Sequence, residues 1–309
     1  MELHKVYPDY PSSDEIDRWA DGIWESANQM KMEVEGLPDP GWRGNFGTFH
    51  APTQIVHFMP EGLHDFYGVL IRPLSGPAPL VVHLPGYGSE LSVHPDVGAQ
   101  GYAVLQLSPM GHWTPNGYDE SLKDPETHDW PPLPYTLDSG AEHGYRDWLL
   151  CAVMAVLWTW KLDCVIPGRV SFYGTSQGGG TSLLLGSLFR DHGVRCVAAD
   201  EPFLVDYPLA DMRGAYWLLK SRMDRIPEQE LGKAWHTLGF ADALAHAYRL
   251  TCPVLLSGGG ADTVCPPETI RKLFEYLPST KSYTFYEGRQ HGYSAPFIQL
   301  ILGWFRAYA

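Results

Sequence analysis

A serine flanked by glycines stands at the centre of the segment Gly174-Thr175-Ser176-Gln177-Gly178. An apolar run precedes this segment and an apolar stretch of helical character follows it. A tight turn from strand to helix in the G-x-S-x-G pattern presents a serine hydroxyl at the end of a sheet, next to free N–H groups at the helix start. The context predicts Ser176 as the nucleophile of an acyl transfer; a glycine-rich turn without chemistry is the alternative.

A serine hydroxyl needs a base, and the base needs an acid to orient it. Asp262 follows the apolar run 254–257, and His291 follows the run 281–286. Serine, acid and histidine then occur in the chain order expected for this class of site. We therefore predict Asp262 as the acid and His291 as the base. Asp262 as a helix cap and His291 as a solvated loop residue are the alternatives, and Asp200 is the rival acid.

Two backbone N–H groups are expected to bind the oxyanion. Gln177 supplies one, because it follows the nucleophile. The other is expected in the loop Pro85-Gly86-Tyr87-Gly88, where we select Tyr87. An ordinary glycine turn is the alternative for that loop.

Short apolar runs alternate with helical stretches through most of the chain, which is typical of a mostly parallel sheet with helices on both faces. With the serine motif, this pattern predicts an α/β-hydrolase fold with an antiparallel start. The expected strands are 53–59, 66–72, 79–84, 102–107, 170–173, 194–199, 254–257 and 281–286. The expected helices are 147–162, 178–190, 267–277 and 295–308.

Two segments flank or interrupt this alternation. Residues 1–50 form an N-terminal extension with a helix over 14–32, and residues 208–248 form a helical insertion before the acid-bearing strand. We expect all of 1–309 to fold as a single domain, since α/β folds often reach this length as one unit.

The segment 111–136 is rich in Pro, Trp, His and Asp and is too long for an ordinary connection. We select His112, Trp113, Trp130 and Tyr135 from it as candidate substrate contacts, because aromatic rings suit a sugar face. Plain packing of these aromatic side chains is an equal alternative.

Charge and cysteine content exclude several classes of protein. Asp and Glu outnumber Lys and Arg by 36 to 22, for a net charge of -14, and there is no basic run, so we expect no nucleic-acid partner. The five cysteines form no C-x-x-C pair, which disfavours a zinc or dithiol site. An unbroken membrane-spanning run and a signal-type apolar region are both missing, so we expect a cytoplasmic protein that does not insert into membranes.

Several segments together resemble the acetyl xylan esterase / cephalosporin C deacetylase family. Ser176-Gln177-Gly178-Gly179 is similar to the family's S-Q-G-G segment, and Asp262-Thr263-Val264-Cys265-Pro266-Pro267 to its D-x-x-C-P-P segment. Pro202-Phe203-Leu204 and Cys252-Pro253-Val254-Leu255 also match its pattern, and the similarity runs from about Pro79 to the end.

This resemblance implies removal of acetyl groups from sugars or similar small-molecule esters, with no metal and no organic cofactor, often by ring-shaped homohexamers. It places Ser176, Asp262 and His291 on the family's triad and Tyr87 and Gln177 on its oxyanion donors. An acyltransferase or peptidase using the same triad is an alternative function, and so is an inert hydrolase-fold binding protein.

The chain departs from the family at three places. Pro85-Gly86-Tyr87 replaces His-Gly-Tyr, Gly111-His112-Trp113 replaces Arg-Gly-Gln, and His291-Gly292 replaces His-Glu. The triad residues survive these changes, whereas the residues that support them differ. The identity of the substrate is therefore the part of the resemblance that carries over least.

Overall fold

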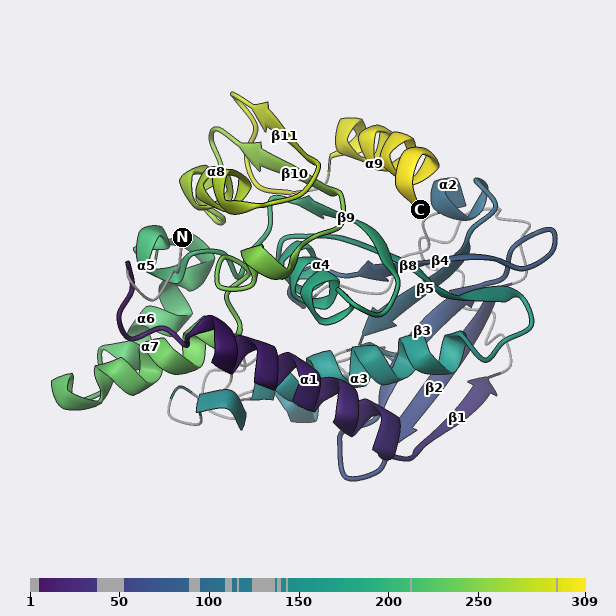
Figure 1. Ribbon diagram of the computed structural model, residues 1–309, viewed down its shortest axis with the longest axis horizontal. Coiled ribbons are helices and arrows are strands. Elements are labelled where there is room, and N and C mark those ends of the chain that lie inside the picture. The colour runs from purple at the N-terminus through teal and green to yellow at the C-terminus, as the bar shows by residue number, and fades with distance from the viewer. Residues whose placement is uncertain are drawn as a thin grey trace.

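A computed structural model of the chain describes residues 6–37, 53–88, 95–108, 113–115, 117–123, 137, 140–142, 144–211, 213–292 and 294–309. Within these ranges nine strands form one sheet in the order β1-β2-β3-β5-β4-β8-β9-β10-β11 (Figure 1). The pairs from β1 to β5 are antiparallel, and the pairs from β5 through β4 to β11 are parallel. The strands are β1 (Met32–Leu37), β2 (Thr53–Pro60), β3 (Phe66–Ile71), β4 (Ala78–Leu84), β5 (Ala103–Ser108), β8 (Val165–Thr175), β9 (Val194–Asp200), β10 (Val254–Gly259) and β11 (Lys281–Tyr286).

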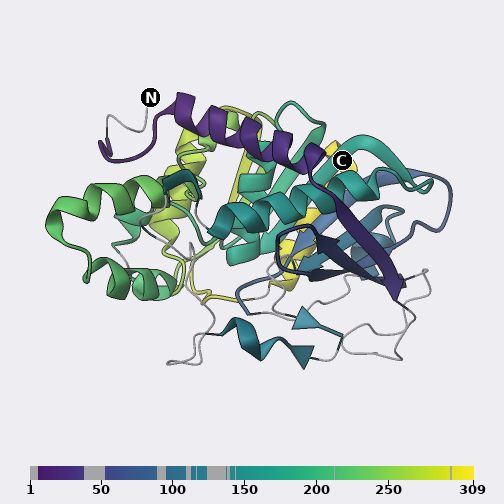
Figure 2. The same ribbon diagram turned by 90° about the horizontal axis from the view of Figure 1, so that it is seen from below.

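Helices cover both faces of the sheet, and a separate core fills each side (Figures 1 and 2). Helices α1, α3, α4 and α8 pack on one face, and α2 and α9 pack on the other. No helix in the described ranges is long and apolar enough to cross a membrane. These helices are α1 (Ser13–Gln29), α2 (Pro95–Gly98), α3 (Gly144–Thr159), α4 (Gln177–Leu188), α8 (Pro267–Tyr276) and α9 (Ala295–Tyr308).

The predicted strands and helices are all present, with ends shifted by a few residues, and the sheet has the predicted antiparallel start. The C-terminal end predicted for the first helix was wrong. The first helix does not reach Met32 but ends at Gln29, and residues 32–37 form β1, which pairs antiparallel with β2. Met30 is already extended (ψ 144°) and caps the helix through its N–H to Ser26.

Helix α1 begins at a capping box. The Ser12 hydroxyl accepts from the Glu15 N–H, and the Glu15 carboxylate accepts from the Ser12 N–H at 2.9 Å. Both bonds satisfy donors that a helix start leaves unpaired. One side of the helix is buried, and its residues recur at the three- and four-residue spacing of an amphipathic helix: Ile16, Trp19, Ala20, Ile23, Trp24 and Ala27.

The predicted insertion is helical, and it is joined to the N-terminal segment. It contains α5 (Tyr207–Ala210), α6 (Trp217–Met223) and α7 (Leu231–Phe240). Tyr7 Oη donates to Asp206 Oδ1 and Tyr10 Oη to Asp242 Oδ2, both at 2.8 Å. Lys272 Nζ lies 2.9 Å from Asp206 Oδ2. Burial and the neighbouring Asp206 raise the pKa of Asp242 to about 7. We call these five side chains the N-terminal clamp.

His246 is a buried neutral histidine near the end of the insertion. Its Nδ1 lies 2.8 Å from Ser187 Oγ and its Nε2 lies 3.0 Å from the Phe240 carbonyl oxygen. A carbonyl only accepts, so Nε2 carries the proton and Nδ1 accepts from the serine. Burial, followed by the nearby Arg249, lowers the pKa of His246 to about 3.

This histidine makes stability depend on pH in a defined direction. Below pH 6.5 the unfolded chain binds a proton at His246 and the folded chain does not, so its contribution is complete above that pH and is lost as pH falls toward 3. We expect His246 to lower the unfolding free energy of the wild type by about 1 kcal/mol for each unit by which the pH falls below 6.5. Urea titrations at pH 7.5 and 5.0 should show a smaller pH-dependent loss for His246→Gln. Equal losses in the two proteins would contradict the assignment.

Candidate active site

The predicted strand–serine–helix turn is present between β8 and α4. Ser176 has φ 56° and ψ -121°, a backbone conformation that costs a non-glycine residue about 1–3 kcal/mol. Three main-chain bonds hold it there. Its N–H donates to the Asp200 carbonyl at 2.9 Å, and its own carbonyl accepts from the N–H groups of Gly180 at 3.0 Å and Phe203 at 2.9 Å. The serine therefore occupies a turn fixed by the neighbouring strand β9.

Glycines make this turn possible by letting backbone pass against backbone. A Cβ on Gly174 would lie 2.5 Å from the carbonyl carbon of Gly178 and from the carbonyl oxygen of Leu84. A Cβ on Gly178 would lie 2.6 Å from the carbonyl oxygen of Pro85 and closer still to that of Leu84. The end of β4 is therefore packed directly on the start of α4.

Asp262 lies in the turn after β10 and is 7% exposed. Its Oδ1 accepts from two backbone N–H groups, those of Val264 at 2.7 Å and Cys265 at 2.9 Å. An aspartate that bonds the backbone two and three residues ahead closes its own turn. The second oxygen, Oδ2, is thereby left to face the loop after β11.

His291 meets this second oxygen. Its Nδ1 lies 2.8 Å from Asp262 Oδ2, and the imidazole is 18% exposed. A carboxylate at Nδ1 fixes the tautomer with the proton on that nitrogen, which leaves Nε2 as the basic nitrogen. The two residues predicted from chain order as acid and base are thus in direct contact.

The serine touches the same turn. Ser176 Oγ lies 4.0 Å from Cys265 Sγ, and the Cys265 N–H binds Asp262. Burial, followed by the charge of Asp262, raises the pKa of the Cys265 thiol well above its ordinary value. The thiol stays protonated at neutral pH, so it borders the serine as a small apolar group and not as a thiolate nucleophile.

The two predicted oxyanion donors lie on adjoining segments. Gln177 is the first residue of α4, at the positive end of the helix dipole. Tyr87 lies in the turn after β4, the strand whose last residue packs on Gly178. Tyr87 is 39% exposed, so this turn lies at the protein surface. Their role as oxyanion donors stays a prediction.

Sequence reasoning missed a second carboxylate beside the histidine, that of Glu201. This side chain is fully buried, and its Oε2 lies 3.5 Å from His291 Nδ1. Burial raises the pKa of Glu201 to about 7, with a further contribution from Asp200; the Gly292 N–H and Arg289 oppose the rise. The dipeptide Asp200-Glu201 at a strand end carries this signal, but the prediction named only Asp200, as the rival acid.

Asp200, the rival acid, is engaged elsewhere. Its Oδ1 accepts from the hydroxyl of Ser257, and its two oxygens each lie 3.3 Å from a nitrogen of Arg289. Thr175 Oγ1 donates to it at 3.4 Å. Asp200 therefore links the end of β8 to the loop after β11. Among the described residues, the carboxylates that pair with His291 are those of Asp262 and Glu201.

Glu201, Asp262 and His291 also form a set that could ligate a metal ion, with one donor atom from each lying within 4.8 Å of the others. Each side chain already has a protein partner for those atoms. Glu201 Oε2 accepts from the Gly292 N–H at 2.9 Å, and Asp262 Oδ2 pairs with the imidazole. The three atoms that face one another, Glu201 Oε2, Asp262 Oδ2 and His291 Nδ1, are therefore already engaged by protein groups.

The predicted substrate contacts divide into two groups. His112, Trp130 and Tyr135 lie outside the described residues. Trp113 is only 3% exposed, and its ring centroid lies 6.4 Å from that of Tyr67 in β3. This geometry favours the packing role for Trp113 over contact with a substrate.

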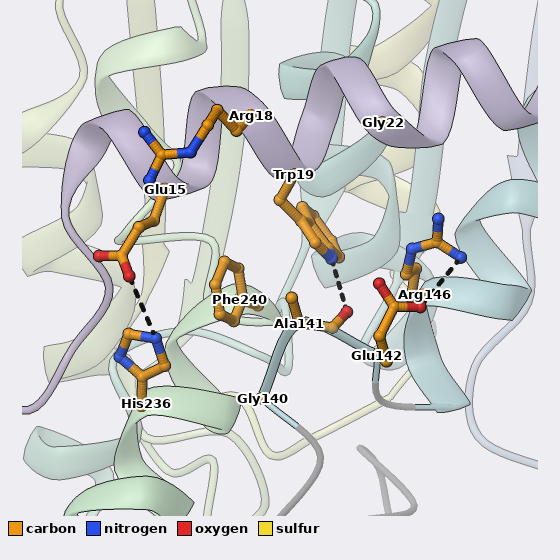
Figure 3. A pocket seen from close by; sticks show the side chains of 10 residues that line it. All are labelled: Glu15, Arg18, Trp19, Gly22, Gly140, Ala141, Glu142, Arg146, His236 and Phe240. Carbon is orange, nitrogen blue, oxygen red and sulfur yellow. Dashed lines mark hydrogen bonds and ion pairs between the residues drawn. The ribbon is translucent and has the colours of Figure 1, made fainter.

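A cavity of about 370 Å³ lies apart from these residues, between α1, α3, α7 and the short helix Gly140–Glu142 (Figure 3). Its charged groups face one another: His236 Nε2 lies 3.5 Å from Glu15 Oε1, and Arg146 lies 3.6 Å from Glu142. Trp19 Nε1 donates to the Ala141 carbonyl across it at 2.9 Å. The residues that line it include neither Ser176 nor His291, so it is not the candidate active site.

Comparison with known proteins gives a consistent family. A family model described as acetyl xylan esterase (AXE1) matches residues 14–307. The chain is 28% identical over 237 residues to acetyl esterase Axe7A from Xylanibacter ruminicola. The aligned region covers 74% of this chain and 52% of that protein. The chain therefore spans about half the length of the curated relative that it matches.

Solved structures resemble the fold over nearly the whole chain. Acetyl xylan esterase 1 from a Thermoanaerobacterium species has a TM-score of 0.79 at 21% identity, covering 98% of this chain and 97% of that one. Acetyl xylan esterase from Paenibacillus sp. R4 has a TM-score of 0.77 at 21% identity, with both chains fully covered. These similarities confirm the predicted α/β-hydrolase architecture.

Proposed function

Because the chain belongs to the acetyl xylan esterase family, we propose that it is a serine carboxylesterase that removes acetyl groups from carbohydrate esters through Ser176, His291 and Asp262. The observation that carries the proposal is the 2.8 Å contact between Asp262 and His291, made by the same turn that borders the Ser176 hydroxyl. The chain matches only about half the length of its curated relative. The proposal therefore concerns this chain alone and does not carry over the activity of the whole relative.

The proposed reaction begins with proton transfer. His291 Nε2 takes the proton from Ser176 Oγ as the oxygen attacks the acyl carbon, and Asp262 stabilises the imidazolium that forms. The backbone N–H groups of Gln177 and Tyr87 bind the negative oxygen, which develops at the positive end of α4. The sugar alcohol leaves with the proton from His291, and water then releases acetate from the acyl-enzyme.

Three further expectations extend this proposal. A single domain over 1–309, a homohexameric assembly and a cytoplasmic location remain predictions, the assembly from the family resemblance alone. None of them is needed for the chemistry of Ser176.

The proposal is tested by ester preference and by labelling. We expect hydrolysis of p-nitrophenyl acetate to exceed that of the butyrate and octanoate, and acetate to be released from acetylated xylo-oligosaccharides. A fluorophosphonate should label one site, which peptide mapping should assign to Ser176.

Other results would redirect the function. Labelling of Ser176 with transfer of the acyl group to an alcohol or amine in preference to water would indicate an acyltransferase. Faster cleavage of matched anilides than of esters would indicate a peptidase. A folded protein that neither reacts with the probe nor turns over an ester would be an inert member of the fold.

A further inference from the structure

Two buried carboxylates approach the same nitrogen of the candidate base. Asp262 Oδ2 lies 2.8 Å from His291 Nδ1, and Glu201 Oε2 lies 3.5 Å from it. They come from different strand ends, Asp262 after β10 and Glu201 after β9. A mechanism with one orienting acid uses the first of these carboxylates and gives the second no role.

Glu201 is held so that one oxygen serves the histidine loop. Oε2 accepts from the N–H of Gly292, the residue after His291, at 2.9 Å. The other oxygen, Oε1, lies 3.3 Å from Arg289 Nε. The Glu201 N–H donates to Ser257 Oγ at 3.1 Å, and its φ of 43° is in the region that non-glycine residues rarely adopt. Such conformations persist where surrounding structure imposes them, often at functional sites.

A simple ion pair with Arg289 does not account for this arrangement. Arg289 already has Asp200, whose two oxygens each lie 3.3 Å from its terminal nitrogens. Glu201 gives Arg289 one oxygen and directs the other toward the backbone and ring of the histidine loop. Its position is therefore explained by His291 at least as much as by the arginine.

We propose that Glu201 is a second acid for His291. Together with Asp262 it positions the imidazole, and it accepts the hydrogen bond from Nδ1–H when Asp262 is removed. The inference rests on the proposed function of Ser176 and His291. Glu201 acts through the histidine, so it is a positioning residue and does not itself touch the substrate.

The charge of Glu201 changes near neutral pH. Burial, Asp200 and Asp262 raise its pKa to about 7, and the Gly292 N–H and Arg289 oppose the rise. The other titratable groups beside it are His291, Cys265 and Tyr286. Loss of the Asp262 charge removes one of the causes that raise this pKa. In a variant without Asp262, Glu201 therefore ionises at lower pH and can stabilise an imidazolium at pH 7 to 8.

The choice of substitution at Asp262 separates the two acids. In Asp262→Asn the side-chain oxygen stays with the N–H groups of Val264 and Cys265, which places the NH₂ group against His291 Nδ1. That donor forces the wrong tautomer, and we expect kcat/KM to fall about 10⁴-fold. Asp262→Ala leaves the ring free to bond Glu201, and we expect a fall of only about 10²-fold.

Asp262→Ala should thus be more active than Asp262→Asn. This is the reverse of the usual result, in which the substitution that preserves the shape of the side chain costs less activity. Adding Glu201→Gln to Asp262→Ala should lower kcat/KM a further 10-fold or more, whereas Glu201→Gln alone should cost about 2- to 5-fold; neighbours that share a partner are non-additive in this way. The activity of Asp262→Ala should also rise with pH as Glu201 ionises, and this rise should be absent from Asp262→Ala/Glu201→Gln.

A readout besides activity is the Nδ1 proton of His291. We expect its downfield ¹H resonance in the wild type and in Asp262→Ala, and its loss in Asp262→Ala/Glu201→Gln. Circular dichroism checks folding. If Asp262→Ala does not fold, Asp262→Ser, whose hydroxyl can accept from the Cys265 N–H, repeats the test. If Glu201→Gln does not fold, Glu201→Asp keeps the charge and withdraws it from the ring.

Equal activity of Asp262→Ala and Asp262→Asn, or no further loss when Glu201 is also changed, would overturn the second acid and leave the esterase proposal intact. The esterase proposal fails separately, if Ser176→Ala remains active or if the probe labels another residue.

Discussion

Ser176→Ala should lower kcat for p-nitrophenyl acetate about 10⁴- to 10⁶-fold, the loss expected when the nucleophile of a serine hydrolase is removed. In the proposed mechanism this hydroxyl forms the acyl-enzyme, and an alanine on the strained turn between β8 and α4 has no atom that could replace it. Residual turnover would come from the oxyanion site and substrate binding alone. The measurement is a steady-state assay of both proteins, with folding checked by circular dichroism.

Ser182→Ala is the matched control for this change. Ser182 lies on the same helix and is buried, and its Oγ donates to the Gly178 carbonyl at 2.7 Å. It tests the loss of a helical hydroxyl without loss of the nucleophile, and we expect kcat to stay within about 3-fold of wild type. High activity in Ser176→Ala would exclude this serine as the nucleophile. Combining that change with Cys265→Ala would then show whether the thiol 4.0 Å away takes over.

Gly178→Ala should destabilise the protein by more than about 4 kcal/mol or prevent folding, because overlap with backbone is a cause of exceptional losses. The new methyl group would lie 2.6 Å from the Pro85 carbonyl oxygen and closer to that of Leu84. Both atoms belong to the main chain at the end of β4, so neither can move aside as a side-chain tip can. Urea denaturation measures the loss, and the esterase assay should fall with it.

Gly303→Ala provides the opposite result from the same chemical change. Gly303 lies on α9, is exposed, and has no atom within 4 Å of the Cβ position. Alanine in a helix interior is favoured over glycine by about 0.5–1 kcal/mol, so this variant should gain stability. Wild-type stability and activity in Gly178→Ala would mean that β4 and α4 are not packed as described.

The sequence predicted the parts of the fold whose signals are local. Buried strands such as β4 and β10 are continuous apolar runs bounded by turn residues, and these features predict a parallel sheet without knowledge of distant contacts. The meeting of Asp262 with His291 followed from the same logic, since parallel strands end at one edge of the sheet. β1 was missed because it is short, half-exposed and follows the first helix within three residues.

Glu201 was missed for a different physical reason. Its contacts are with Arg289, His291 and Gly292, about ninety residues further along the chain, and no local spacing encodes them. Its neighbour Asp200 had the same local signal, a carboxylate at a strand end, yet the structure directs it to Ser257 and Arg289. Which of two adjacent acids faces the histidine depends on the backbone turn at φ 43°, a tertiary property.

The N-terminal clamp places a constraint on the order in which the protein can be completed during synthesis. Tyr10 leaves the ribosome before its partner Asp242, which follows 232 residues later. At typical elongation rates of about 5–20 residues per second, this interval is roughly 10 to 50 s. Throughout it the apolar side of α1 lacks the helices of the insertion and Tyr10 lacks its acceptor. The clamp therefore closes only after residue 242 has been made, so Tyr10 is among the last of the described residues to reach its native hydrogen bond.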